Sequence, residues 1–165
     1  SDLKDVSLED HSVDLVTAAM AVHWFDLDSF YSTVRRAAKR DGILAVWMYH
    51  LPVIDPAIDA IVQHYYDKVL DGYWPELFHY IDERYQTLPF PFEEVEAPKF
   101  EIQTEWELGQ LAGFLDSWSA TRRYQNQRGQ HPVSLIWEEL AGAWGEGSLR
   151  REVRWPLYLR AGRAG

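Results

Sequence analysis

Two nearly continuous apolar runs stand near the start of the chain, with a helix-like segment between them. They cover residues 13–22 and 43–49, and such runs are typical of strands that are covered on both faces, as in a parallel sheet. Between them, apolar residues recur every three or four positions, as on one face of a helix: Leu27, Phe30, Tyr31, Val34 and Ala38. Asp26 or Asp28 would cap this helix, and the Asp-Gly pair at 41–42 would end it. The pattern predicts a βαβ unit with a right-handed crossover.

The rest of the chain alternates between helical and strand-like patterns. Apolar residues at helical spacing predict helices, one of them a lid, and strict alternation of apolar and polar residues predicts strands with one exposed face. The expected elements, in chain order, are a helix over residues 58–70, a short helix and a loop over 74–91, a strand over 100–106, helices over 107–125 and 133–144 separated by a breaker at 128–132, and a strand over 152–160. We therefore expect a single α/β domain over residues 1–165.

Composition and charge narrow the kinds of partner. The 165 residues are 47% hydrophobic and 25% charged, an ordinary balance for one globular domain. Their aromatic share of 15% suits either extra core packing or an aromatic-lined pocket. The formal net charge of -10 repels phosphate groups, so we expect no nucleic-acid partner and no membrane partner. The chain has no cysteine, no apolar run of about 18 residues and no signal-peptide pattern, so we expect a cytoplasmic protein.

Several common catalytic motifs are absent from the sequence. It contains no Gly-rich phosphate loop, no metal-binding pair of histidines on a helix and no Gly-x-Ser-x-Gly elbow. The six histidines are scattered, so we interpret them as polar surface or core residues and expect no metal. Adjacent carboxylates such as Glu93-Glu94 point apart on a strand or helix, so they do not share a proton. These observations exclude nucleotide-phosphate and zinc-hydrolase chemistry.

The most specific pattern combines the first strand, the turn after it and the second strand. It reads Glu9-Asp10-x-Ser-Val-Asp-Leu-Val-Thr-x-Ala-x-Ala-Val-His-Trp-Phe-Asp and then Lys39-Arg40-Asp41-Gly42-Ile43-Leu44-Ala45-Val46-Trp47. This pattern resembles the unit from strand 4 to strand 5 of class I S-adenosylmethionine-dependent methyltransferases, in the small-molecule branch that includes the trans-aconitate methyltransferase-like proteins. The His-Trp-Phe after the strand is its most telling part. The stretches at 118–121 and 154–159 are also similar to that branch.

The resemblance implies a seven-stranded, Rossmann-like sheet in the order 3-2-1-4-5-7-6, with strand 7 antiparallel and S-adenosylmethionine above the carboxyl ends of strands 1, 2 and 4. The chain would supply an incomplete version of this fold, strands 4-5-7-6 with a helical cap. The family's Gly-rich loop and its ribose-binding acidic residue would lie before Ser1. Leu3-Lys4 stands where the family often has an acidic pair near the adenine. We therefore expect this C-terminal part of the domain to bind little or no cofactor alone.

Matching positions in the family imply eight site residues. Those beside the methionine end of the cofactor would be Ala19, Met20, His23 and Trp24. The alternative interpretation is that Ala19 and Met20 only pack at the end of the strand and that Trp24 only fills the core. Those that recognise the substrate would be Tyr49, Trp118, Arg122 and Arg123, where the two guanidinium groups suit a carboxylate or, alternatively, form a solvated helix face. Transfer in this class is an in-line displacement that chiefly requires positioning, and the sequence names no general base.

Two functional interpretations follow from the resemblance to this family. In the first, the chain is part of a methyltransferase that acts on a small molecule, with a carboxylic acid as one candidate, and is inactive by itself. In the second, it is a non-catalytic module that binds a small ligand or a protein through its aromatic-rich helices. Without strands 1 to 3, the apolar strand at 13–22 would be an exposed edge, so we expect a homodimer through that edge.

Overall fold

The computed structural model describes residues 8–165, and their contacts divide the chain into two compact units. Unit 1 contains the described part of Ser1–His50 together with Leu77–Phe100 and Pro156–Gly165. Unit 2 contains Leu51–Glu76 and Glu101–Trp155. The domain predicted over residues 1–165 therefore consists of two parts, each of which has its own apolar core.

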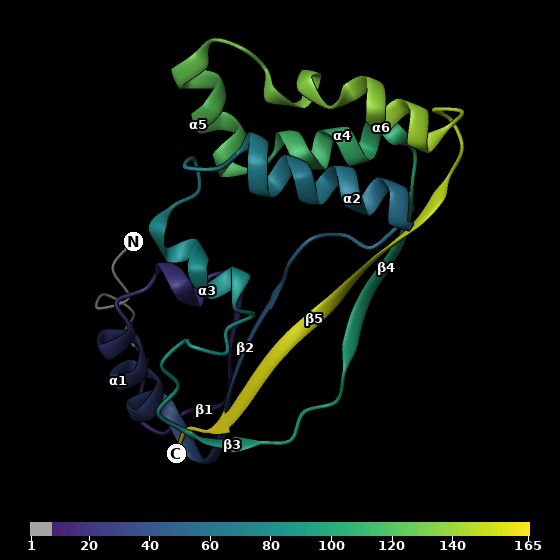
Figure 1. Cartoon of the computed structure of the whole chain (residues 1–165). Coiled ribbons are helices and arrows are strands. Elements are labelled where there is room, and N and C mark those ends of the chain that lie inside the picture. Colours follow the sequence, from purple (N-terminus) through teal and green to yellow (C-terminus); the bar gives the residue numbers. More distant parts are fainter. Residues whose placement is uncertain (1–7) are drawn as a thin grey trace. The chain divides into compact units, whose positions relative to one another are not determined.

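A parallel strand-helix-strand unit opens unit 1 (Figure 1). Its elements, in chain order, are strand β1 (Val13–Ala19), a 3-10 turn (Val22–Trp24), helix α1 (Leu27–Ala37) and strand β2 (Ala38–Tyr49). The two strands pair in parallel, from Leu15 opposite Ile43 to Ala19 opposite Trp47. The prediction of two neighbouring parallel strands around a helix is confirmed.

Helix α1 begins at the predicted place and ends earlier than predicted. The Asp26 carboxylate accepts a hydrogen bond from the backbone amide of Ser29 at 2.8 Å, which caps the first turn. The last helical residue is Ala37, and strand β2 follows at once. The prediction that the Asp-Gly pair at 41–42 ends the helix is therefore wrong, because both residues lie in β2.

The glycine of that pair serves an irregularity in the strand. The pairing of β1 with β2 places Val13 opposite Ala38 but Leu15 opposite Ile43, so the register shifts between these two positions. A Cβ atom on Gly42 would lie 2.9 Å from the carbonyl oxygen of Lys39. Because real Cβ atoms do not approach a backbone oxygen so closely, the bulged strand requires glycine here.

Three further strands complete the sheet. Strand β5 (Arg151–Arg163) is antiparallel to both β2 and the short strand β3 (Glu93–Val95), and strand β4 (Phe100–Trp106) also pairs with β5. The main path of the sheet runs in the order β1-β2-β5-β3. The predicted strands at 100–106 and 152–160 are present, the latter extended at both ends, whereas β3 was not predicted.

The two faces of β1 and β2 differ in burial. Leu44, Val46 and Met48 are 0% exposed and pack in the core of unit 1 with residues of α1. On the opposite face, Trp47 is half-buried, and Leu15 of β1 is 57% exposed. Strand β1 therefore presents an apolar side chain to solvent at the end of the sheet.

A short helix lies between the second and third strands of unit 1. Helix α3 (His79–Asp82) follows a 3-10 turn at Glu76–Phe78, as predicted for residues 74–91. After it, Tyr85 and Leu88 are buried in the core of unit 1. No helix among residues 8–165 is both long enough and apolar enough to pass through a lipid bilayer.

Unit 2 consists mainly of helices. In chain order they are α2 (Pro56–His64), which continues as a π-helical turn (Tyr65–Val69), α4 (Leu108–Asp116), α5 (Ser119–Arg128), a 3-10 turn (Pro132–Leu135) and α6 (Trp137–Trp144). The helix predicted over 107–125 is therefore wrong as a single element, because the chain leaves helical geometry at Trp118 and helix α5 begins one residue later. Leu111, Leu140 and Trp144 are 0% exposed and form the centre of this core.

Candidate functional site

The turn after β1 has an uncommon backbone conformation. Met20, directly after the strand, has a φ of 49°, in the left-handed region that residues with a side chain seldom adopt. Its amide donates to the carbonyl oxygen of Trp47 at 2.9 Å, and its sulfur accepts a hydrogen bond from the amide of Tyr49 at 3.3 Å. These contacts tie the end of β1 to the end of β2. Ala19, beside Met20, is exposed.

A buried histidine in the same turn holds it against the core of unit 1. His23 is 3% exposed, and its Nδ1 atom lies 2.7 Å from the hydroxyl of Tyr85. Burial lowers the pKa of His23 to about 4 and raises the pKa of Tyr85, so the imidazole is neutral and the phenol is protonated near neutral pH. In these states the hydroxyl can donate to an unprotonated Nδ1. His23 therefore holds the turn in place, and because it is buried it is not accessible to a ligand.

Trp24 is the exposed member of this turn. Its side chain is 49% exposed, its ring centroid lies 5.0 Å from that of His23, and it meets Phe78 edge-on at 5.8 Å. The interpretation of Trp24 as a core plug is wrong, because half of its surface is open to solvent. An aromatic ring supported from two sides offers a flat, fixed surface to a ligand.

The four predicted cofactor residues thus fall into two groups. Ala19 and Trp24 are accessible, and Met20 is half-buried. His23 supports the others through Trp24 and Tyr85. The group that would contact the cofactor is small, uncharged and partly aromatic, so it can position a ligand but cannot transfer a proton. Leu3-Lys4, which stands where the family often has an acidic pair near the adenine, lies outside the described residues.

The four predicted substrate residues are divided between the two units. Tyr49 belongs to unit 1, where it lies at the end of β2 and contacts Met20 through its amide. The other three belong to unit 2 and lie at or within the first turns of α5: Trp118, Arg122 and Arg123. The structure therefore groups Tyr49 with the cofactor candidates of its own unit.

Trp118 and the two arginines have different environments in unit 2. Trp118 is half-buried in a cluster of aromatic rings, with its centroid 5.5 Å from that of Trp74 and 5.6 Å from that of Phe114. Arg122 and Arg123 are exposed, and Arg123 donates a long hydrogen bond of 3.4 Å to the carbonyl oxygen of Tyr73. Trp118 is therefore held by packing, whereas both guanidinium groups face solvent.

Sequence reasoning missed Tyr85 and Phe78, the two residues that support the turn from the segment around α3. The aromatic richness of residues 74–91 was visible in the sequence. The segment lacks periodicity, however, so nothing in it indicated which ring would meet His23. Tyr85 also has a φ of 59°, a conformation that sequence patterns do not reveal for a tyrosine.

The parallel strands β1 and β2 with the crossover helix α1 between them, and the candidate site at the carboxyl end of β1, define an α/β protein with a Rossmann-like βαβ unit. A family described as "Methyltransferase domain" matches residues 1–46. A presumed type II methyltransferase from Anaeromyxobacter dehalogenans, of known structure, is 39% identical with a TM-score of 0.88, covering 95% of this chain and 67% of that chain. The chain belongs to the class I methyltransferase family.

A second relative agrees with this assignment. A presumed methyltransferase from Dictyostelium discoideum is 30% identical over 161 residues, which are 93% of this chain and 61% of that protein. The chain thus spans 61% of one relative's length and 67% of the other's.

Proposed function

We propose that the described residues form one side of an S-adenosylmethionine site in an enzyme that methylates a small molecule. Family membership supports the reaction class, and one observation supports the place: the exposed Ala19 and Trp24 at the carboxyl end of β1. Ligands of open α/β sheets bind outside the carboxyl ends of the strands. Ala19 leaves room beside the strand, and Trp24 offers an aromatic surface, so the residues present fit this part of the cofactor.

The residues of the turn act by positioning. S-adenosylmethionine supplies a methyl group on a sulfonium, and its transfer by in-line displacement depends mainly on how donor and acceptor are held. Trp24 would contact the cofactor, while His23 and Tyr85 fix the orientation of its ring from the buried side. Met20 and Tyr49 keep the ends of the two strands together, so the site has one defined shape.

Binding at this turn can be tested with two substitutions. Both variants are measured in the chain co-expressed with the N-terminal segment of the Anaeromyxobacter relative, where we expect cofactor binding to be tight enough for calorimetry. Ala19→Trp should fill the space beside the strand, and Trp24→Ala should remove the aromatic surface; each is expected to weaken S-adenosylmethionine binding by about tenfold or more. Trp137→Ala is the matched control, since Trp137 is 43% exposed in unit 2. Equal weakening by the control, or unchanged binding with Ala19→Trp, would contradict the proposed place.

We further propose that tight cofactor binding needs the part of the relatives' length that this chain does not match. In the family, the Gly-rich loop and the ribose-binding carboxylate come from strands that precede the first strand described here. Calorimetry should therefore give weak or no binding of S-adenosylmethionine to the 165-residue chain. Co-expression with the N-terminal segment of the Anaeromyxobacter relative should restore it. Tight, stoichiometric binding by the 165 residues alone would refute this dependence.

The methyl acceptor that we propose is a small carboxylic acid, as in the trans-aconitate methyltransferase-like branch, and the reaction would take place in the cytoplasm. Arg122 and Arg123 are exposed on α5, and a guanidinium group binds a carboxylate through two parallel hydrogen bonds. In the chain co-expressed with that N-terminal segment, Arg122→Gln and Arg123→Gln should each raise the KM for the acid with little change in kcat. An unchanged KM in both arginine variants would remove these residues from the proposed acceptor site.

The exposed side of β1 also supports a proposal about association. Leu15 is 57% exposed on a strand at the end of the sheet path, and exposed apolar edge strands favour pairing with another chain. We expect the 165-residue chain to form a two-fold dimer through β1. Sedimentation should show dimers that Leu15→Lys converts to monomers. A monomer at high micromolar concentration would refute the dimer.

A further inference from the structure

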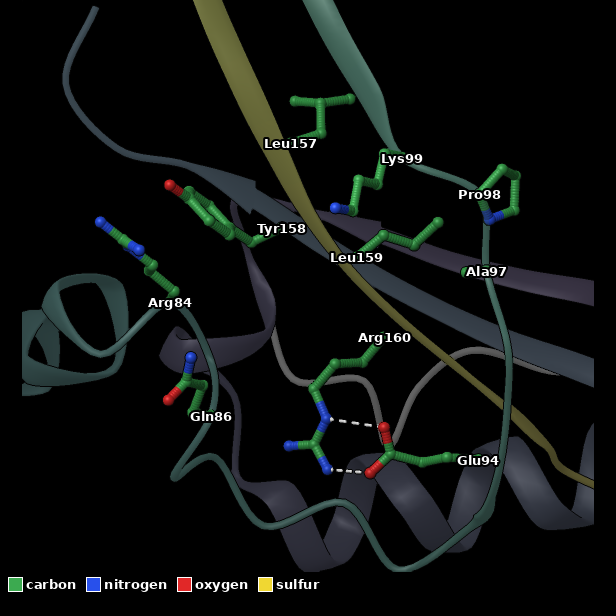
Figure 2. A pocket seen from close by; sticks show the side chains of 10 residues that line it. All are labelled: Arg84, Gln86, Glu94, Ala97, Pro98, Lys99, Leu157, Tyr158, Leu159 and Arg160. Atoms are coloured by element: carbon green, nitrogen blue, oxygen red, sulfur yellow. Dashed lines mark hydrogen bonds and ion pairs between the residues drawn. The ribbon is translucent and has the colours of Figure 1, made fainter.

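A hollow on unit 1, distinct from the strand-end turn, combines basic side chains with an apolar wall. It is lined by residues 157–160 of β5, by the turn after α3 and by the segment between β3 and β4 (Figure 2). Pro98, Leu157 and Leu159 form apolar parts of the lining, and Tyr158 contributes an aromatic ring. All of the lining residues belong to unit 1, so the hollow is defined within a single compact unit.

One of the three basic residues in the hollow, Arg160, makes hydrogen bonds within the protein through all of its guanidinium nitrogens. Arg160 forms a two-pronged ion pair with the carboxylate of Glu94, drawn in Figure 2, with one of the two contacts at 3.2 Å. Its remaining nitrogen donates to the carbonyl oxygens of Tyr85 at 2.9 Å and Leu88 at 2.7 Å. Arg160 also lowers the pKa of Glu94, so this carboxylate stays charged and neutralises the guanidinium. The pair therefore fastens β3 and the turn after α3 to β5.

The other two basic residues are not neutralised in this way. Arg84 and Lys99 are exposed, and neither forms an ion pair with any residue in the described range 8–165. The guanidinium carbon of Arg84 lies 4.9 Å from the centroid of the Tyr158 ring, so the group is held in place by stacking. Figure 2 shows its planar head group beside that ring. The chain as a whole carries a net charge of -10, so an anion is attracted to this hollow only by the local positive charge of Arg84 and Lys99.

The backbone at Arg84 costs free energy. Arg84 and the following Tyr85 have φ values of 55° and 59°, and two consecutive non-glycine residues in the left-handed region are disfavoured by about 1–2 kcal/mol each. The burial of Tyr85 and its hydrogen bond to His23 offset this cost for the second residue. For Arg84, the conformation has the effect of setting the guanidinium on the ring of Tyr158 at the border of the hollow.

From these observations we propose that the hollow binds a small organic monoanion, a carboxylate attached to an apolar body. The stacked guanidinium of Arg84 presents its remaining N–H groups to the carboxylate, and Lys99 adds a second positive charge. The apolar body lies against Leu157, Leu159 and Pro98. Glu94 in the same hollow and the negative charge of the chain disfavour ligands with several charges. This site does not depend on methyl transfer or on S-adenosylmethionine.

Phenylacetate and its neutral analogue phenylacetamide distinguish the proposed site from a nonspecific apolar surface. In two-dimensional NMR of the 165-residue chain, phenylacetate should give saturable shifts centred on Gln86, Lys99 and Tyr158. Phenylacetamide, which keeps the ring and loses the charge, should bind about tenfold more weakly. Saturable shifts confined to other residues, or equal affinity for the two compounds, would overturn the proposal.

Variants test the two cations directly. Arg84→Gln and Lys99→Gln should each weaken phenylacetate binding by about threefold to tenfold, with the midpoint of thermal unfolding as a check on folding. Arg40→Gln is the matched control, because Arg40 is an exposed arginine of unit 1 outside the hollow. If Arg84→Gln fails to fold, Arg84→Lys, which keeps the charge and loses the planar fork, should still bind more weakly than the unmodified chain. Unchanged affinity in Lys99→Gln and in the folded Arg84 variant would overturn the proposal.

Discussion

The Nδ1 atom of His23 and the hydroxyl group of Tyr85 lie 2.7 Å apart, although 62 residues separate them in the chain. This hydrogen bond joins the turn after β1 to the segment after α3, and it is buried within unit 1. A buried imidazole that is neutral and bonded on one nitrogen is sensitive both to loss of its partner and to added protons. Two predictions follow from this pair.

Tyr85→Phe should lower the free energy of unfolding by about 1–3 kcal/mol, because it leaves a buried ring nitrogen of His23 without its hydrogen bond. Chemical denaturation at pH 7 measures the change. Tyr124→Phe is the control, since the Tyr124 hydroxyl has no hydrogen-bond partner in the described part of the chain and its loss should change stability by less than about 0.5 kcal/mol. An equal loss in the two variants would show that the pair contributes nothing specific.

Acid should destabilise the fold through the same histidine. The pKa of His23 is about 4 in the folded chain and 6.5 in its ordinary state, so below pH 6.5 the unfolded chain binds a proton that the folded chain does not. Stability therefore falls as the pH is lowered from 6.5 to about 4, by at most about 3 kcal/mol for this group. Denaturation at several pH values should show a smaller decrease in His23→Gln. An identical pH dependence of the two proteins would rule out this contribution.

Gly162 of β5 should not tolerate a side chain. A Cβ atom there would lie 2.8 Å from the Cε1 atom of Phe90 and 2.8 Å from the Cβ atom of Phe92. Gly162→Ala should therefore cost about 1–3 kcal/mol of unfolding free energy through overpacking. Gly109→Ala is the matched control, because nothing lies within 4 Å of its Cβ position in α4, and it should stabilise the helix by up to about 1 kcal/mol. Equal stability of the two variants would contradict the packing described for β5.

Asp55 has two separable contributions in unit 2. Its Oδ1 atom accepts from the amides of Ala57 at 3.0 Å and Ile58 at 3.1 Å, and its Oδ2 atom pairs with Arg151 at 3.0 Å. Asp55→Ala removes both and should cost about 1–3 kcal/mol, whereas Asp55→Asn keeps a capping oxygen and should cost about 0.5–1 kcal/mol. Thermal and urea denaturation measure both variants. A larger loss for Asp55→Asn than for Asp55→Ala would contradict the assignment of Asp55 as the cap.

The elements of unit 1 whose apolar residues form a continuous run or recur at helical spacing could be predicted from the sequence. Strand β1, helix α1 and strand β2 carry continuous or helical apolar patterns, and the parallel pairing follows from their order. The end of α1 could not be located, because Asp-Gly is a signal for several irregular conformations. In this chain Gly42 lies at a shift of strand register instead of a helix end.

The break between α4 and α5 could not be predicted from the spacing of apolar residues either. Apolar residues continue at helical spacing through the break, so the sequence indicates one helix. The structure satisfies the freed backbone groups locally: the Ser117 hydroxyl donates to the carbonyl oxygen of Phe114 at 2.6 Å, and the Thr121 hydroxyl donates to that of Leu115 at 2.8 Å. Such side-chain bonds compete with helical ones and leave no periodic trace.

For the candidate site, the strand-end residues could be found because they are neighbours in the sequence. Ala19, Met20, His23 and Trp24 belong to one motif, and the structure does place them in one turn. Their roles differ in burial, which depends on Tyr85 and Phe78 from a distant segment. The short strand β3 was missed for a similar reason, since its three residues become a strand only through pairing with β5.

The division of unit 1 into three separate stretches of chain constrains the order in which the protein can form during synthesis. Its last stretch, Pro156–Gly165, supplies Arg160, which fastens the turn after α3 and Glu94 of β3. Every stretch of unit 2 leaves the ribosome before this one. The helices of unit 2 can therefore pack while β1 and β2 still lack their antiparallel neighbour, and the sheet of the nascent chain stays incomplete until residues 156–165 emerge.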